Sequence, residues 1–215
     1  MSWLARRKRE QFTGWIAGFG TDSGHRVVIG HWHTSPYGAV TDAMVEDPAD
    51  HRTLYAPTPQ LAKFLGAAYG FHDVQVARCS ARCSGPRWRV QAGPLQVSLT
   101  LGRRNLLGWL LWAMPAALAR TPWWVGLMDF PARWLLAGVR TRGRTRDGRR
   151  QWYGAQDLHP IIAANATLRG RDLGGLRAVQ PPVGFGFGSV PGRPSLVHLT
   201  TMIETVRPPN GGHSA

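Results

Sequence analysis

The chain has 215 residues and a formal net charge of +14, and 43% of its residues are hydrophobic, which argues against whole-chain disorder. This length suits one domain with a sizeable core. The basic residues 1–10 lack the apolar run and cleavage site of a secretory signal, and Cys79 and Cys83 are the only cysteines, so we expect a cytoplasmic protein with two free thiols.

The first strands are predicted close together. Residues 12–19 and 25–33 form a hairpin signal around the turn 20–24, which contains an aspartate and two glycines. Residues 39–46 and 52–56 predict a second strand pair. Such short connections are typical of antiparallel neighbours in one sheet.

A helix interrupts these strands. Apolar residues at helical spacing predict it over 59–69, with Thr58 as its N-cap and a proline in its first position. Strand patterns return at 72–78, 87–91 and 95–101, and in the last of these apolar and polar residues alternate strictly. That alternation predicts a sheet with one buried and one wet face.

The second half of the sequence predicts a helical insertion and then more strands. The insertion spans about 106–136 and contains two apolar helices, broken at Pro122. A basic turn covers 140–150. The remaining strands are predicted at 151–159, 161–168, 183–187 and 195–206, before a Pro- and Gly-rich tail at 207–215 that we expect to be disordered.

These elements predict an α+β fold, a mainly antiparallel β-sheet curled into a barrel, with one early helix and a two-helix insertion. Closure is expected because it removes exposed strand edges. Residues 1–10 are predicted to be a flexible basic arm and residues 11–206 a single β-rich domain. The alternating glycines at 184–188 suit a tight bend at a barrel corner.

Two histidines flank a tryptophan on a predicted strand, so His31 and His33 point to the same face. Two imidazoles at this spacing can share a metal ion. No glutamate follows within a few residues, and the nearest carboxylates, Asp42 and Glu46, lie beyond a turn. We therefore predict no metal site and expect the pair to line a pocket mouth or to face water.

A carboxylate and an imidazole also share a strand face at Asp157 and His159, with Tyr153 predicted on that face too. Such a pair supports acid–base catalysis, or it forms a structural hydrogen bond. No nucleophile motif, dinucleotide fingerprint or phosphate-binding loop occurs in the sequence, so no cofactor is predicted. The residues expected to line a ligand site are His31, His33, Asp42, Trp152, Tyr153, Asp157 and His159.

Ten tryptophans exceed what a core of this size needs. The leading hypothesis is therefore binding, with or without conversion, of a small apolar or aromatic molecule inside the barrel. A rival hypothesis is attachment to anionic membranes through the Trp-rich helices at 106–136. Because Pro115 and Pro122 would let these helices fold back, we expect Trp109, Trp112, Trp123 and Trp124 to point toward the sheet.

Arginine supplies most of the positive charge, since Lys8 and Lys63 are the only lysines. It binds phosphates and stacks on aromatic rings, yet the arginines are scattered, which is also what a GC-rich genome produces. We therefore predict no specific nucleic-acid partner. Weak non-specific binding through the basic surface, best placed at 140–150, remains a second alternative.

Three tracts resemble a family of uncharacterised actinobacterial proteins: Ser35–Glu46 (SPYGAVTDAMVE), Gly148–His159 (GRRQWYGAQDLH) and Phe185–Pro191 (FGFGSVP). The resemblance covers most of the chain and implies no activity. At the level of strand pattern the sequence is also similar to β-barrels of the acetoacetate-decarboxylase or lipocalin type. Decarboxylase chemistry needs a desolvated lysine, and neither Lys8 nor Lys63 stands in such a motif.

Overall fold

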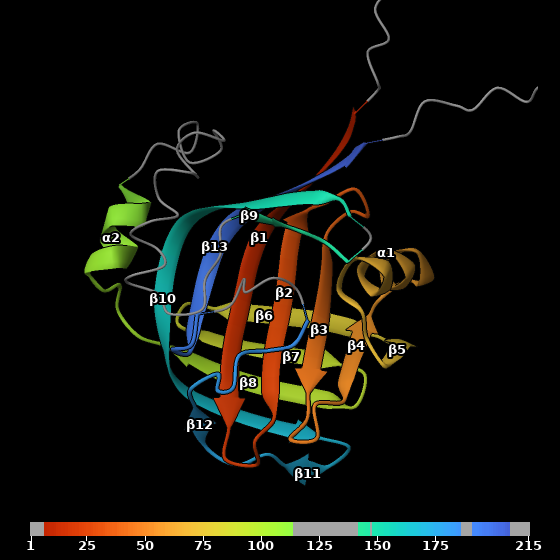
Figure 1. Cartoon of the computed structure of the whole chain (residues 1–215). Coiled ribbons are helices and arrows are strands. Elements are labelled where there is room, and N and C mark those ends of the chain that lie inside the picture. Colours follow the sequence, from red (N-terminus) through yellow and green to blue (C-terminus); the bar gives the residue numbers. More distant parts are fainter. Residues whose placement is uncertain (1–6, 114–141, 147, 186–190, 207–215) are drawn as a thin grey trace, which may run out of the picture.

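The structure is a computed structural model that describes residues 7–113, 142–146, 148–185 and 191–206 (Figure 1). The predicted helix at 123–136 and the predicted disordered tail at 207–215 lie outside the described residues. The first strand begins at Arg7, inside the stretch predicted to be a flexible arm, because residues 7–10 pair with the last strand.

The strands of the described residues form one mainly antiparallel sheet, with the order β5-β4-β3-β2-β1-β13-β10-β8-β7-β6 along its main path. Strands β4 and β5 are parallel and are connected through α1. The elements are β1 (Arg7–Thr21), β2 (Arg26–Thr34), β3 (Val40–Glu46), β4 (Arg52–Ala56), α1 (Pro59–Tyr69), β5 (Asp73–Val76), β6 (Cys79–Ser84), β7 (Arg87–Ala92), β8 (Leu95–Leu101), α2 (Leu106–Trp112), β9 (Arg142–Arg144), β10 (Arg150–Leu168), β11 (Arg171–Asp172), β12 (Leu176–Arg177) and β13 (Ser195–Val206).

The sheet curls into a half-barrel because β10 belongs to both of its halves. The first part of this 19-residue strand pairs with β13, and its last part pairs with β8. Figure 1 shows β6, β7 and β8 crossing behind β1, β2 and β3. The predicted β-rich, mainly antiparallel class is confirmed, and the curl is a half-barrel.

The prediction of two strands separated by Pro160 is wrong, since β10 runs through this residue. Pro160 pairs with Ser195 of β13, and the next residue, Ile161, already pairs with Leu101 of β8. A proline removes one ladder hydrogen bond, and a strand tolerates it where the partner strand changes. Residues 183–185 of the predicted strand at 183–187 are irregular.

Alternate residues of the central strands build two separate cores. The concave core fills the space between the two halves of the curled sheet, and the helix-side core lies on the opposite face, under α1. Large buried members of the concave core are Phe19, Val27, Ile29, Tyr55, Trp88 and Leu99. Those of the helix-side core include Phe12, Ile16, Val28, Leu54, Leu61, Phe64 and Leu65.

Helix α1 has the bounds predicted from the sequence. The Thr58 hydroxyl accepts a hydrogen bond from the Leu61 backbone N–H at 3.3 Å, as expected of an N-cap, and a proline occupies the first helical position. Gly70 ends the helix with φ of 69°. The apolar side chains at helical spacing all face the sheet, so α1 forms the lid of the helix-side core.

Candidate functional site

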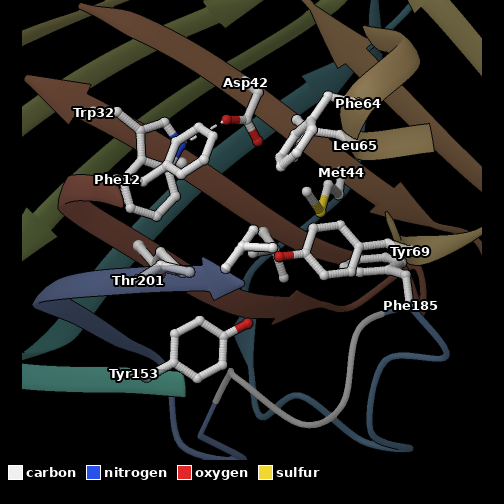
Figure 2. A pocket seen from close by; sticks show the side chains of 14 residues that line it. Phe12, Trp32, Asp42, Met44, Phe64, Leu65, Tyr69, Tyr153, Phe185 and Thr201 are labelled. Atoms are coloured by element: carbon white, nitrogen blue, oxygen red, sulfur yellow. Dashed lines mark hydrogen bonds between the residues drawn. The ribbon is translucent and has the colours of Figure 1, made fainter. Parts of the chain in front are cut away.

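A cleft opens between α1 and the helix-side face of the sheet. It has about 40 Å³ of room for the centres of water molecules, and the empty space grows to about 540 Å³ only when the open solvent at its mouth is included. Figure 2 shows side chains from both the sheet and the helix directed into it. The described residues that line it are Phe12, Ile16, Val28, Gly30, Trp32, Asp42, Met44, Phe64, Leu65, Tyr69, Tyr153, Phe185, Thr201 and Ile203.

This cleft lies on the face of the sheet opposite to the barrel interior, where the sequence predicted a ligand site. The concave interior is packed with large side chains, among them Phe19, Trp88 and Leu99, each at most 6% exposed. The cleft instead uses the residues of opposite parity on β1, β2 and β3. A period of two along each strand separates the two faces, and the sequence pattern does not say which face packs completely.

Asp42 is the one carboxylate among the described residues that line the cleft, and it is 2% exposed. Its Oδ1 accepts a hydrogen bond from Trp32 Nε1 at 2.8 Å, and Figure 2 shows the carboxyl group turned toward the space between Phe12, Phe64 and Met44. Burial raises the pKa of Asp42 to about 7, against which the Trp32 hydrogen bond acts to lower it.

Gly30 makes room for this hydrogen bond. A Cβ atom at this position would lie 2.6 Å from Trp32 Nε1 and 2.7 Å from Asp42 Oδ1. Both distances are shorter than any normal nonbonded contact of a Cβ atom. The close approach of the β2 backbone therefore requires glycine here, and it positions the carboxyl group at the floor of the cleft.

The remaining polar groups of the cleft are hydroxyls. The Gln151 side-chain amide donates to Tyr69 Oη at 2.6 Å and to Tyr153 Oη at 2.9 Å, which fixes both rings. The Thr201 hydroxyl is buried and has no hydrogen-bond partner among the described residues. No arginine, lysine or histidine is among the described lining residues, although the chain carries 26 lysines and arginines.

One edge of the cleft is closed by the segment 181–185, which buried charges hold in place. Glu46 Oε2 accepts from the Gly184 backbone N–H at 2.6 Å, and Arg52 donates to the Gly184 carbonyl at 2.9 Å. Arg26 lies 3.6 Å from Glu46 and donates to the Pro181 carbonyl at 3.4 Å. These contacts place Phe185 against the cleft.

His31 and His33 share a strand face, as predicted, but that face is the concave one. His31 Nδ1 is hydrogen-bonded to Thr41 Oγ1 at 2.9 Å, and the His33 ring stacks on His198 with centroids 5.6 Å apart. Burial, and to a lesser degree the charge of His33, lower the pKa of His31. The pair therefore lies away from the cleft and from Asp42. The described residues contain no cluster of three or more side chains that could hold a metal ion.

Asp157 and His159 also lie on the concave side, where Arg104 occupies the carboxylate. Arg104 Nε and Nη2 each donate to Asp157 at 2.8 Å, and His159 Nε2 lies 3.4 Å from Oδ2. Burial acts to raise the pKa of Asp157, but the hydrogen bonds and charges of Arg104 and His159 outweigh it and lower the pKa. Both oxygens of Asp157 already accept hydrogen bonds, and the group is ionised. It therefore fits a structural role better than a role in acid–base catalysis.

The predicted third member of that face, Tyr153, lies on the other side. A β-bulge between Ala155 and Asp157 shifts the register of β10 against β13, so residues on either side of it exchange faces. Tyr153 consequently lines the cleft together with Asp42. Trp152, half-buried, is not among the described lining residues.

The tryptophans of α2 are exposed, which contradicts the expectation that they point toward the sheet. Trp109 is 52% and Trp112 57% exposed, beside Leu106 and Leu110 at 78% and 59%. The Arg104 guanidinium lies 5.4 Å from the ring centroids of both tryptophans. Gly108 contacts β10 instead, because a Cβ there would lie 2.3 Å from the Leu158 carbonyl oxygen. Trp123 and Trp124 lie outside the described residues.

The arginines are less scattered than the sequence suggests. Arg78, Arg82 and Arg89 lie together with Gln91 on the polar face of β6, β7 and β8, along a shallow groove.

Cys79 and Cys83 are free thiols, and burial, followed by the charge of Asp42, raises the pKa of Cys79 to about 12. A thiol in that state is unreactive.

The residues that sequence reasoning missed are those that complete the cleft: Phe12, Trp32, Phe64, Tyr69, Phe185 and Thr201. They come from β1, β2, α1, β13 and the segment before residue 186, so their proximity depends on the tertiary fold. One local signal was present. A buried aspartate within strand β3, opposite a glycine of β2, is unusual for a packed sheet.

No family model and no curated protein matches this chain. Among solved structures it is similar to a Nitrosomonas europaea protein provisionally named AttH, at 13% sequence identity and a TM-score of 0.29. The match covers 92% of this chain, which spans 51% of that protein. A likeness of this degree carries no functional argument, and the resemblance to an actinobacterial family stays a prediction.

Proposed function

We propose that the protein binds a small, largely apolar molecule in the cleft between α1 and the sheet. The observation that carries this proposal is a buried carboxyl group, Asp42, turned into a space lined otherwise by apolar and aromatic side chains. Ligand sites commonly combine an apolar lining with a few polar groups that orient the molecule. A folded core has no use for an ionisable group in such a place.

We further propose that the protein converts this ligand chemically. A carboxyl group whose pKa is about 7 can give or take a proton near neutral pH, as a general acid or base must. Tyr69 and Tyr153 present hydroxyls in the same cleft. We propose a cytoplasmic location for this activity, as the sequence predicted.

Thermal unfolding in the presence of apolar and aromatic compounds tests the binding proposal. A ligand at 100 times its dissociation constant stabilises the folded state by about 2.7 kcal/mol, a shift of roughly 5–10 °C for a chain of this size. Val28→Phe, which fills the cleft floor, should abolish the shift. Ile162→Ser, at a residue that is 61% exposed, is the control and should leave it unchanged. If no compound gives a shift that Val28→Phe removes, the proposal fails.

A second candidate function is attachment to anionic membranes through the exposed patch of α2, here defined as Leu106, Trp109, Leu110 and Trp112. Tryptophan favours the bilayer interface, and Arg103, with a net charge of +14 for the chain, favours anionic headgroups. None of the helices in the described residues is long and apolar enough to cross a membrane. The patch would therefore lie on the bilayer surface.

Co-sedimentation with vesicles containing anionic lipid tests this second candidate. We expect binding at low salt that weakens at 0.5 M salt, because surface charge attraction is screened there. Trp109→Ser/Trp112→Ser should lose at least about 10-fold in partition coefficient, since two interfacial anchors are removed. Val76→Ser, at another exposed apolar residue, should not change it. Protein that stays in the supernatant at low salt would contradict attachment.

A further inference from the structure

The lining of the cleft has a sign of charge opposite to that of the protein. Asp42 is its carboxylate, and the described lining residues include no cationic side chain, in a chain with net charge +14. Fatty acids, phosphates and other anions would meet an uncompensated carboxylate in a site without a cation to pair with them. The cleft therefore suits a neutral or a cationic ligand.

Aromatic rings surround the carboxyl group. Phe12 and Trp32 meet edge to face with centroids 5.5 Å apart, and Phe12 stacks on Phe64 at 5.6 Å. Tyr69, Tyr153 and Phe185 complete the aromatic part of the lining. Figure 2 shows these rings on several sides of the space below Asp42. The faces of such rings attract cations, and a cage of them is the usual protein site for quaternary ammonium groups.

We propose that the ligand of the cleft is an organic cation, an apolar body bearing an amine or quaternary ammonium group that Asp42 pairs with inside the aromatic lining. This inference rests on the proposed function and names its ligand class. A bound cation supplies the countercharge that Asp42 lacks, since the Trp32 indole gives it one neutral hydrogen bond among the described residues. The rings supply the remaining contact, beside the hydroxyls of the cleft. Phe64 already carries the Arg149 guanidinium 4.8 Å from its ring centroid, so the other rings are the ones left for the ligand.

Protonation distinguishes a cationic from a neutral ligand. An ammonium group pairs with the ionised carboxylate, so its binding releases a proton from Asp42 wherever the free protein holds that proton. A neutral carbonyl ligand accepts a hydrogen bond from the protonated carboxyl group. Its binding therefore causes Asp42 to take up a proton wherever the free protein has lost it. The other titratable side chains facing the cleft are the phenols of Tyr69 on α1 and Tyr153 on β10. The lining residues of β1, β2 and β13 and the segment with Phe185 are not titratable.

Isothermal titration calorimetry with two isosteric probes tests the inference. Benzyltrimethylammonium carries a fixed positive charge, and neopentylbenzene has the same shape without it. The cation should bind about 10-fold more tightly at pH 8 than at pH 6, and because binding releases a proton the observed heat should vary with the ionisation enthalpy of the buffer. Asp42→Asn should remove this pH dependence and weaken cation binding at pH 8 by at least about 10-fold. Neopentylbenzene should bind equally to both proteins.

Asp157→Asn is the matched control, because it removes one negative charge from the opposite face of the sheet and should leave cation binding unchanged. If neopentylbenzene binds and the cation does not, or if Asp42→Asn affects both probes equally, the cation inference is wrong and the proposed function stands. If neither probe binds, the inference is wrong, and the wider compound screen with Val28→Phe decides the proposed function.

Discussion

Asp42→Asn is expected to stabilise the protein at pH 8 by about 3 kcal/mol. The pKa of Asp42 rises from 3.8 in the unfolded chain to about 7 in the folded protein, mainly because burial disfavours the charged form. A rise of three units corresponds to about 4 kcal/mol at about 1.4 kcal/mol per unit. Asparagine carries no charge to bury, and a weaker hydrogen bond with Trp32 subtracts about 1 kcal/mol.

The sign of the pH dependence follows from the direction of the shift. Between pH 4 and 7 the folded protein holds a proton that the unfolded chain has lost, so each step upward in pH destabilises the folded state. Above pH 7 both states are ionised at this residue and the penalty is constant. The difference between Asp42→Asn and the wild-type protein should therefore grow from less than about 1 kcal/mol at pH 4 to its full value at pH 8.

Urea denaturation at pH 4, 6 and 8 measures this effect. Asp157→Asn is a control of opposite sign, because the pKa of Asp157 is lowered and its ionised form stabilises the folded state. That variant should be less stable than wild type at pH 8, and its deficit should stay nearly constant down to pH 4, because the stabilisation by ionised Asp157 is lost only below the pKa of 3.8 in the unfolded chain. A wild-type protein as stable as Asp42→Asn at pH 8 would contradict the burial of an ionisable Asp42.

A residue that destabilises its own fold is typical of a binding site. Selection keeps such a residue where its function compensates for the lost stability. Met44, two residues further along β3, lies on the same face as Asp42. It is apolar and packs in the helix-side core without a polar partner. Asp42 therefore differs from its neighbours in chemistry and not in position, and this contrast supports a ligand for the cleft.

The local elements were predictable because their signals are local. Helix α1 was predicted with its bounds from Thr58, Pro59 and the apolar spacing, and β8 and β13 from alternation and length. Strand β6 was missed, because Cys79–Ser84 is short and rich in small and polar residues. The half-barrel depends on β10 changing partners at Pro160, which no pattern within the strand indicates.

The candidate site was predictable only in part, because face assignment requires an exact register. Asp42 and Tyr153 were selected from the sequence and both line the cleft. His31, His33 and Asp157 were selected with them and lie on the opposite face. The bulge beside Asp157 exchanges the faces to which the following residues of β10 point. A one-residue shift of this kind cannot be recognised in a strand whose polar and apolar residues do not alternate strictly.

Arg26→Met is expected to destabilise the protein by about 3–5 kcal/mol, since it removes one partner of a buried ion pair and leaves Glu46 without it. Arg26 is 2% and Glu46 3% exposed, and Arg26 also donates to the Asp47 carbonyl at 3.1 Å and to Asp50 at 2.7 Å. Methionine has a similar length and satisfies none of these acceptors. Urea denaturation at pH 7 measures the loss.

The cause is distinguishable from simple misfit. Glu46→Gln added to Arg26→Met removes the orphaned charge while an oxygen acceptor remains for the Gly184 N–H, so the double variant should recover at least about half of the lost stability. Arg177→Met breaks an exposed pair with Asp22 and should change nothing measurable. Because Arg26 and Glu46 both hold the segment 181–184, Arg26→Met should also weaken ligand binding in the cleft. Retention of full stability and full binding by Arg26→Met would show that this charge cluster does not hold Phe185 in place.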